Sequence, residues 1–228
     1  MTASPQRCAI SWSAGKDSWL ALLRERESGR CIDVFVTMCD ADGRSKSHAL
    51  APELVQAQVE ALGGTWRPVR VPEGEYAARF DACLRALAAE GITAMVFGDI
   101  DLQAHRDWLV PACARAGVAA RFPLWGHARR ALAQELIERG VQARIVCVDT
   151  KVLDATFCGL PYDQRFIERL PDTVCPCGED GEFHTFVTGG PGFDRSLAVR
   201  SRGRRREASR PPFAPAEFVF DELELQAA

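Results

Sequence analysis

The sequence predicts an α/β fold, a layered and mostly parallel sheet followed by a small β-rich C-terminal part. From residue 8 to residue 148, apolar strand-like runs alternate with amphipathic helix-like segments. A parallel strand pair needs a crossover, usually a helix, so the alternation indicates a parallel sheet covered on both faces. After Asp149, glycines, prolines and strand-like pieces replace this alternation. We therefore expect two parts, residues 1–150 and residues 151–228.

The expected strands of the first part are short apolar runs, each ending near a glycine or a polar residue. They cover residues 8–12, 32–39, 65–71, 93–98, 118–122 and 142–148. Pro68 places the third of these runs at a sheet edge or at a strand end, because proline donates no ladder hydrogen bond. We expect the last run, 142–148, to complete the parallel sheet.

The expected helices lie between these strands, at residues 18–23, 50–62, 75–90, 103–116 and 128–139. In the third helix Phe80, Leu84 and Leu87 fall on one face. Gly63 and Gly91 end the second and third helices. In the C-terminal part we expect a short helix at 162–170 and strands at 182–188, 196–202 and 217–225.

The composition is that of a soluble globular protein, with 47% hydrophobic and 26% charged residues. The formal net charge of −3 gives no general attraction to nucleic acid or to a membrane surface. The first seven residues lack an apolar signal core, and no apolar run approaches the ~18 residues of a membrane span. We expect a cytoplasmic protein without a membrane partner. A homodimer is compatible with the sequence.

The nine cysteines are an odd number and lie mostly inside apolar runs, which is typical of reduced thiols that act as small hydrophobes. Cys175 and Cys177 form the one close pair in the sequence. Their one-residue spacing, with no second pair nearby, is a poor zinc or dithiol signature. A structural role in a loop is the favoured interpretation.

A loop of small residues with one lysine, which we call the 13–18 loop, joins the first strand to the first helix. It consists of Ser13, Ala14, Gly15, Lys16, Asp17 and Ser18. Gly15 tolerates a positive φ and Ala14 keeps the approach open, while the first amides of the helix point at a bound anion. We expect the loop to hold a phosphate group, with Lys16 as an exposed loop lysine.

Two alternatives exist for this loop. A P-loop of the common nucleotide-binding type requires glycine where Ile10 stands and Ser or Thr where Asp17 stands, so that motif is excluded. A plain strand-to-helix connection without a ligand is the second alternative, and the loop alone does not exclude it.

Polar or glycine residues also follow two other strands of the predicted parallel sheet. Asp40 comes after the second strand, and Gly98 and Asp99 come after the fourth. Ligands of such sheets bind beyond the carboxyl ends of the strands, near the point where the strand order reverses. These positions therefore suit a nucleotide with Mg²⁺. For Asp40, a helix cap or turn is an equally good interpretation.

A second polar cluster, which we call the 177–187 stretch, lies in the C-terminal part. Its polar and glycine members are Gly178, Glu179, Asp180, Gly181, Glu182, His184 and Thr185. On a strand, Glu182 and His184 would project from one face and Phe183 and Thr185 from the other. Carboxylates and an imidazole this close together indicate either a ligand site or a solvated hairpin turn.

Taken together, these segments resemble a known family. The 13–18 loop resembles the S-G-G-K-D-S pyrophosphate loop (PP-loop) of ATP pyrophosphatases, with Ala14 in place of the first glycine. Its pairing with the 177–187 stretch resembles the diphthine–ammonia ligase family. Residues 97–100 (FGDI), 105–108 (HRDW) and 122–126 (FPLWG) are similar to further segments of that family, in the same order.

The resemblance implies a fold of the adenine-nucleotide α-hydrolase type and an ATP-dependent carbon–nitrogen ligase. It implies that ATP and Mg²⁺ are held by Ser13, Ala14, Gly15, Lys16, Asp17, Ser18, Asp40, Gly98, Asp99, His105 and Arg106, with Asp17 on the metal. The substrate side would comprise Gly178, Glu179, Gly181, Glu182, His184 and Thr185. The catalytic candidates are Lys16, Asp17, Glu182 and His184. Cys175 replaces an acidic residue of similar sequences, which leaves the substrate open.

The implied reaction activates an unidentified carboxylate acceptor as an acyl-adenylate, releases pyrophosphate and forms an amide with ammonia. Two alternatives remain. An RNA-binding or tRNA-modifying enzyme is suggested by six arginines within residues 200–210, although a solvated hairpin tip is the favoured interpretation and nucleic acid is a disfavoured partner. A nucleotide-binding sensor without turnover is the other.

Overall fold

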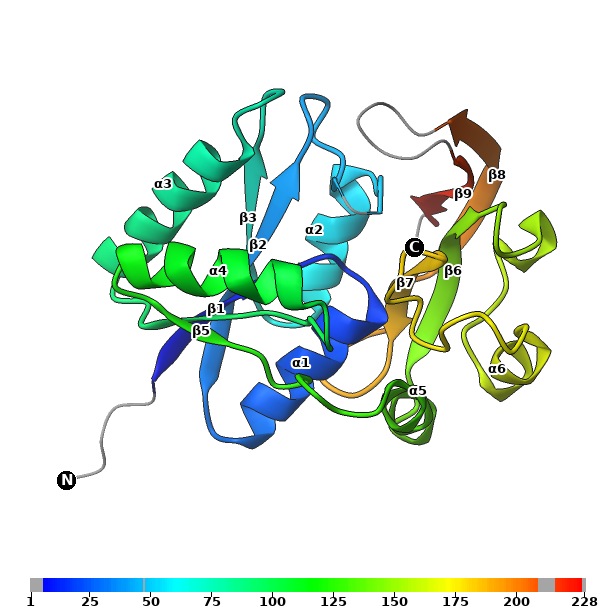
Figure 1. Ribbon diagram of the computed structural model, residues 1–228, viewed down its shortest axis with the longest axis horizontal. Helices are drawn as coiled ribbons and strands as arrows, with labels where there is room; N and C mark the ends of the chain where they lie inside the picture. The colour runs from blue at the N-terminus through cyan, green and yellow to red at the C-terminus, as the bar shows by residue number, and fades with distance from the viewer. Residues whose placement is uncertain (1–5, 47, 209–215, 227–228) are drawn as a thin grey trace.

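The computed structural model describes residues 6–46, 48–208 and 216–226, which fold into two sheets with helices packed around them (Figure 1). The first sheet has five strands in the order β3-β2-β1-β4-β5, and the second has four in the order β7-β6-β9-β8. The first sheet is entirely parallel and the second entirely antiparallel. The predicted α/β class, with a parallel sheet and a small β-rich C-terminal part, is confirmed.

The strand order of the parallel sheet reverses at its central strand. The strands are β1 (Arg7–Ser11), β2 (Cys31–Cys39), β3 (Thr65–Arg70), β4 (Ala94–Val96) and β5 (Ala119–Arg121). In β1, Cys8, Ala9 and Ile10 are wholly buried, as expected for a strand covered on both faces. The chain runs outward through β2 and β3 on one side of β1 and through β4 and β5 on the other. The carboxyl end of β1 is therefore the topological switch point, where α/β sheets bind their ligands.

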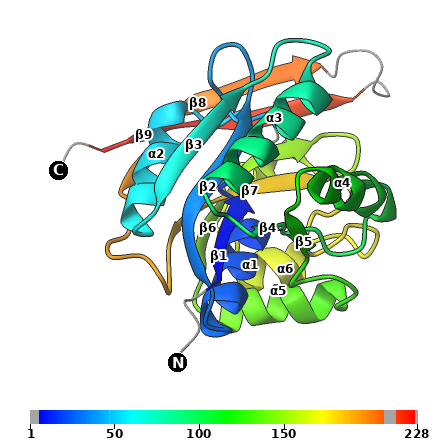
Figure 2. The ribbon, with the colours of Figure 1, turned by 90° about the vertical axis from the view of Figure 1, so that its left-hand side faces the viewer.

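Helices cover both faces of this sheet (Figure 2). They are α1 (Lys16–Glu27), α2 (Pro52–Ala61), α3 (Tyr76–Ala89) and α4 (Gln103–Arg115), whereas α5 (Arg129–Glu138) lies beside α1, to which the ion pairs Arg24–Glu135 and Arg139–Glu27 join it. Ala9 of β1 belongs to the core shared with α3 and α4, whereas Cys8 and Ile10 belong to the core shared with α1 and α2. The alternation of side chains along the strand produces this division.

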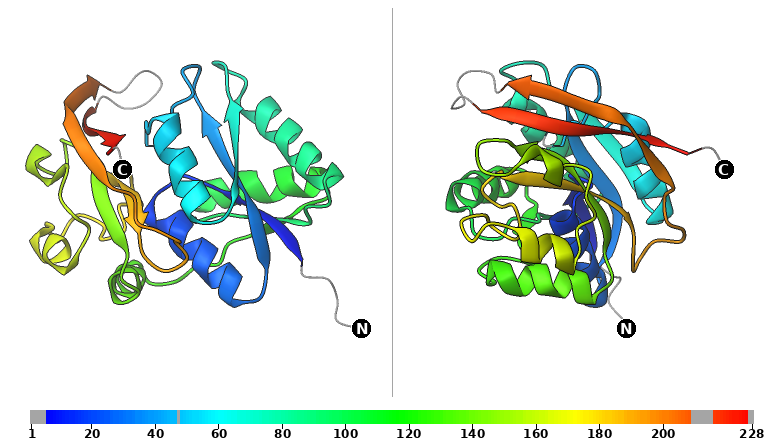
Figure 3. Two further views of the ribbon diagram at one scale, coloured as in Figure 1. Left: turned by 180° about the vertical axis from the view of Figure 1, so that it is seen from behind. Right: turned by 90° about the vertical axis from the view of Figure 1, so that its right-hand side faces the viewer.

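The second sheet lies on the far side of α1 and α2 (Figure 3). It contains β6 (Gln142–Asp149), β7 (Phe183–Gly189), β8 (Val199–Ala208) and β9 (Glu217–Leu225), and η1 (Ala155–Phe157) and α6 (Gln164–Arg169) connect β6 to β7. Phe186 and Val187 of β7 join the same core as Trp19 and Leu20 of α1. The second sheet is thus packed directly against the helix that begins at the 13–18 loop.

The expectation that residues 142–148 complete the parallel sheet is wrong. They form β6, which pairs antiparallel with β7 and β9. The error has a simple cause, since Ile145, Val146, Cys147 and Val148 are all buried and any central strand with two covered faces has this apolar pattern. The change of sheet falls between β5 and β6, and the division at residue 150 remains a proposal about how the chain is organised.

The arginine-rich segment forms most of β8, and its side chains pair with acidic residues of β9. Arg200 pairs with Glu224, Arg205 with Glu222 and Arg206 with Glu217. These ion pairs favour the interpretation as a solvated structural hairpin over a nucleic-acid surface. Arg210 lies outside the described residues.

No helix among the described residues is both long and apolar enough to cross a membrane.

Candidate active site

The 13–18 loop turns the chain from β1 into α1 at the switch point of the parallel sheet. Its positive φ lies at Ala14 (67°), whereas Gly15 is extended with a φ of −90°. The positive φ that Gly15 would tolerate is therefore adopted by Ala14 instead. Glycine at the Ala14 position would adopt this conformation without strain, which explains why the related loop motif carries glycine there.

Glycine is required at position 15 because there is no room for a side chain, and not because of its φ. A Cβ atom on Gly15 would lie 2.9 Å from His48 Nε2 and 3.2 Å from the Thr185 carbonyl oxygen. The backbone at position 15 therefore passes closer to His48 and Thr185 than any residue with a Cβ atom would permit.

The loop hydroxyls bind the loop's own backbone. Ser18 Oγ donates to the Gly15 carbonyl at 2.9 Å and lies 3.1 Å from Ser13 Oγ, which accepts from the Gly15 amide at 3.3 Å. These contacts shape the N-terminus of α1, where the helix dipole favours a negatively charged group.

The 13–18 loop and the 177–187 stretch are in direct contact. The Lys16 amide donates to Thr185 Oγ1 at 3.0 Å, and the Val187 amide donates to the Ala14 carbonyl at 3.1 Å. Strand β7 thus runs beside the loop as an additional partner of its backbone. The structure brings together two segments that are far apart in the sequence, since Lys16 and Thr185 are separated by 169 positions.

Lys16 is buried, with 2% of its surface exposed, and the expectation of an exposed loop lysine is wrong. Its Nζ donates to Asp17 Oδ2 at 2.7 Å and to the Cys177 carbonyl, and lies 5.6 Å from the ring centres of both Tyr162 and Phe183. Burial alone lowers the pKa of Lys16, but the Asp17 carboxylate and further negative groups outweigh it and hold the pKa above its usual value. Lys16 therefore remains charged inside the protein.

Carboxylates gather around this ammonium group. Asp17 Oδ1 is buried and has no hydrogen-bond partner among the described residues. An unpartnered carboxylate oxygen beside a phosphate-type loop fits the ligand chemistry of Mg²⁺. Glu179 Oε1 accepts from the Ile100 amide at 3.2 Å, and burial followed by the negative charge of Asp17 raises the pKa of Glu179 to about 7.

The raised pKa of Glu179 predicts a pH-dependent stability. The folded chain keeps this proton up to about pH 7, whereas an ordinary glutamate loses it near 4.5, so the stabilisation is present at pH 4.5 and is lost as the pH rises to 7. As the pH rises from 5 to 7.5, the free energy of unfolding of Glu179→Gln should increase by about 1–2 kcal/mol relative to that of the parent chain. This value is already reduced for the partial exposure of Glu179. Urea titrations across this range measure the difference, and the exposed Glu138→Gln is the control. A difference that does not change with pH would contradict the assignment.

The segment after β4 forms another side of the site. His105 Nδ1 pairs with Asp99 Oδ1 at 2.8 Å, and this hydrogen bond raises the pKa of His105. The guanidinium of Arg106 lies 4.6 Å from the ring centre of Trp125. A Cβ atom on Gly98 would lie 2.9 Å from the Ser18 amide nitrogen, so β4 ends directly against the first turn of α1.

Gly98→Ala should therefore displace the N-terminus of α1. The added methyl meets backbone atoms, which cannot move aside, and overpacking of this kind costs about 1–3 kcal/mol. We expect a lower urea midpoint and weaker nucleotide binding, measured together on the purified variant. Unchanged values for both would show that the helix start tolerates the methyl group.

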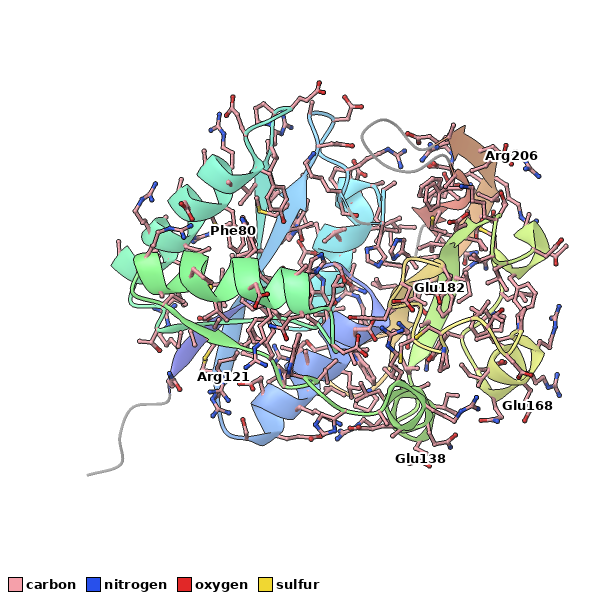
Figure 4. All side chains as sticks on the ribbon, viewed as in Figure 1. Phe80, Arg121, Glu138, Glu168, Glu182 and Arg206 are labelled. Atoms are coloured by element: carbon pink, nitrogen blue, oxygen red, sulfur yellow. The ribbon has the colours of Figure 1, made fainter. Side chains whose placement is uncertain are left out.

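Two predicted residues have structural partners that limit their chemistry. Asp40 Oδ1 accepts from the amides of Asp42 and Arg44 at 3.1 and 2.9 Å, so Asp40 forms a turn. Glu182 is buried at the start of β7 (Figure 4), and its two oxygens accept from the amides of Cys175 and Asp180 at 2.8 and 3.0 Å. These bonds favour a role for Glu182 in shaping the 175–180 loop.

The glycines of the 177–187 stretch serve the same loop. Gly178 has a φ of 64°, and a Cβ atom there would lie 2.6 Å from the Phe183 carbonyl oxygen. Gly181 also has a positive φ, and its amide donates to the Gly178 carbonyl at 3.2 Å. The turn brings the Cys177 carbonyl to Lys16.

His184 forms a pair with a residue that the sequence analysis missed. The ring centres of His184 and His48 lie 4.5 Å apart. Burial lowers the pKa of His184 to about 4 and that of His48 well below its usual value, so both imidazoles are neutral at pH 7. His48 follows β2 as a single histidine in a loop, and no motif marks it in the sequence. The sequence analysis also missed Tyr162, whose ring flanks Lys16, because no motif marks this residue.

Two family models and one curated protein match this chain. A family model described as the diphthamide synthase N-terminal domain matches residues 6–120, and one described as the diphthamide synthase C-terminal domain matches residues 128–210. A curated diphthine–ammonia ligase from Bos taurus is 32% identical over 120 residues, covering 50% of this chain and 45% of the bovine protein. The chain spans about half the length of that relative.

Proposed function

Because the chain belongs to the diphthamide synthase family, we propose that it is an ATP-dependent ligase of the PP-loop type that forms an amide from a carboxylate and ammonia. The single observation that carries the proposal is the contact between the two motifs. The 13–18 loop lies at the switch point of the sheet and at the N-terminus of α1. The Lys16 amide of this loop donates a hydrogen bond to Thr185 Oγ1 of β7. The name of the bovine relative supports the ligase class.

The proposed reaction uses ATP to convert the carboxylate into a better acyl donor. A carboxylate oxygen of the acceptor attacks the α-phosphate, forming an acyl-adenylate and releasing pyrophosphate. Ammonia then attacks the acyl carbon, the amide forms and AMP leaves. The N-terminal part, residues 1–150, would hold the nucleotide. The C-terminal part, residues 151–228, would bind the acceptor.

Groups at the start of α1 would stabilise the leaving pyrophosphate. The helix N-terminus and the charged Lys16 supply positive potential without reorganisation, because Asp17 and the Cys177 carbonyl already fix the ammonium group. Mg²⁺ bound at Asp17 Oδ1 would neutralise part of the phosphate charge. Gly98, Asp99, His105 and Arg106 would line the nucleotide side.

The neutral imidazoles of His48 and His184 would orient the attacking ammonia, because a neutral ring nitrogen accepts a hydrogen bond. The positive charge of Lys16 contributes to keeping both rings neutral. His184 retains its proposed catalytic role, and we add His48 to it. Glu182, bound to two amides, would act by positioning the loop.

The proposal is tested by product analysis. The chain is incubated with ATP, Mg²⁺, ammonium and a panel of carboxylic acids and carboxylate-bearing peptides, and the nucleotide products are separated by chromatography. The expected result is AMP and pyrophosphate whose formation depends on one acceptor class. Acceptor-dependent ADP and phosphate would overturn the proposal, and tight ATP binding without turnover across the panel would favour a nucleotide sensor.

A further inference from the structure

Gln58 of α2 is a buried polar side chain that belongs to none of the predicted site motifs. It has 0% of its surface exposed, and its amide group makes three hydrogen bonds. Oε1 accepts from Trp12 Nε1 at 2.8 Å, and Nε2 donates to the carbonyls of Ala14 and Val187 at 3.0 and 2.5 Å. Gln58 therefore joins the residue that follows β1, the 13–18 loop and strand β7.

The three partners fix the orientation of this amide group. An indole N–H only donates and a backbone carbonyl only accepts, so the amide oxygen faces Trp12 and the NH₂ group faces the two carbonyls. The Trp12 carbonyl accepts from Thr37 Oγ1 at 2.9 Å, which in turn accepts from Trp66 Nε1 at 3.0 Å. The network thus extends into β2 and β3, and the parallel sheet anchors the partner of Gln58.

Ala14, the loop residue that Gln58 contacts, has an unfavourable backbone conformation. Its φ of 67° is left-handed, and a Cβ atom lowers the population of this conformation by about tenfold. Residues other than glycine keep such a conformation only where their surroundings impose it. The Ala14 carbonyl accepts from the Gln58 side chain and also from the Val187 amide, at 3.1 Å, so these two bonds hold the residue in place.

The bond from Gln58 also fixes the direction of a loop amide. The Ala14 carbonyl and the Gly15 N–H are parts of one planar trans peptide unit and point in opposite directions. A bond that fixes the carbonyl therefore also fixes the amide of Gly15, the N-cap residue of α1. Gln58 thus influences the start of the helix from which a phosphate group would be bound.

We propose that Gln58 is a positioning residue for the nucleotide, because it holds Ala14 in the left-handed conformation and so keeps the 13–18 loop in the form that binds phosphate. The inference rests on the proposed function, which assigns ATP to this loop. Both polar atoms of the Gln58 side chain are bonded within the protein, so Gln58 acts through Ala14 and not on the ligand. Glycine at position 14 needs no such support, and the effect of removing Gln58 should therefore depend on the residue at that position.

A double-mutant cycle on ATP affinity tests this dependence. Gln58→Met keeps the volume of the side chain but donates no hydrogen bond, and Ala14→Gly removes the Cβ atom that disfavours the left-handed conformation. With Mg²⁺ present, Gln58→Met should weaken ATP binding about tenfold in the parent chain and less than about threefold in the Ala14→Gly chain, measured by isothermal titration calorimetry. A side chain that contributes only to global stability would not be rescued by this glycine.

Two further variants complete the cycle. Gln58→Asn, whose amide is one methylene shorter, should show the same loss and the same rescue, and it replaces Gln58→Met if that chain does not fold. Gln56→Met is the matched control, because Gln56 is exposed on the same helix and bonds Glu60 there, and its ATP affinity should stay within about twofold of the parent. Equal losses in the parent and Ala14→Gly chains, or an unchanged affinity in Gln58→Met, would overturn the proposal.

Amide hydrogen exchange measures the effect on the loop without a nucleotide. The Val187 amide donates to the Ala14 carbonyl, so its exchange rate reports the conformation of the loop. The reference is the amide of Leu84, a wholly buried residue of α3 whose exchange reports global unfolding. Relative to this reference, the Val187 amide should exchange about tenfold faster in Gln58→Met than in the parent chain, and near the parental rate when Ala14→Gly is added.

The exchange experiment also separates this inference from the proposed function. Faster exchange that Ala14→Gly does not reverse would overturn the role of Gln58. If the exchange rates are as expected but the parent chain binds no ATP, the proposed function is contradicted and the role of Gln58 in holding the loop is supported.

Discussion

Lys16→Met is expected to abolish ATP turnover and also to destabilise the fold by about 2–4 kcal/mol. The ammonium group is buried between Asp17, the Cys177 carbonyl and the rings of Tyr162 and Phe183. Methionine fills the space but leaves the Asp17 carboxylate without its cation and the carbonyl without its donor. An exposed lysine, as the sequence suggested, could be replaced without loss of stability, and the burial of Lys16 reverses that expectation.

Urea denaturation and nucleotide product analysis measure the two effects of Lys16→Met separately. Lys151→Met is the matched control, because Lys151 is exposed, and it should leave both quantities unchanged. The loss of turnover should persist at 10 °C in the absence of denaturant, where a folded population remains. A Lys16→Met chain with parental stability and turnover would remove Lys16 from the site altogether.

Glu182→Gln is expected to cost about 2–3 kcal/mol of stability. Its two carboxylate oxygens accept from the amides of Cys175 and Asp180, and a glutamine can accept only one of these bonds. Its NH₂ group would face the other amide, donor against donor. Because the same loop carries the Cys177 carbonyl to Lys16, nucleotide binding should weaken together with stability.

The matched control for this variant is Glu168→Gln. Glu168 lies on the exposed side of α6, away from Glu182 (Figure 4), and its partner is a surface glutamine. We expect a change in its free energy of unfolding within about 0.5 kcal/mol. If Glu182→Gln instead kept parental stability and ATP binding but lost product formation, the carboxylate would act on the acceptor rather than on the loop.

The sequence alone determined the elements and the two motifs, because both depend on local patterns. Alternating apolar runs and helical faces predict the five strands of the parallel sheet and the helices that cover it, but they also add residues 142–148 wrongly as a sixth strand. The order of small residues, lysine and aspartate in the 13–18 loop, with the glycines of the 177–187 stretch, predicts a phosphate site, and this site stays a prediction. Each strand, helix or motif is recognised from the types and spacing of neighbouring residues, without knowing which distant segment it contacts.

Only the tertiary structure decided which strands pair and which groups become buried. The sheet to which β6 belongs depends on β7 and β9, which lie far along the chain, and its apolar pattern is the same in either sheet. The burial of Lys16 depends on the second sheet, and the pairing of His48 with His184 depends on β7 running beside the loop. Burial and pKa arise from groups that are close in space but distant in sequence, so local patterns do not contain them.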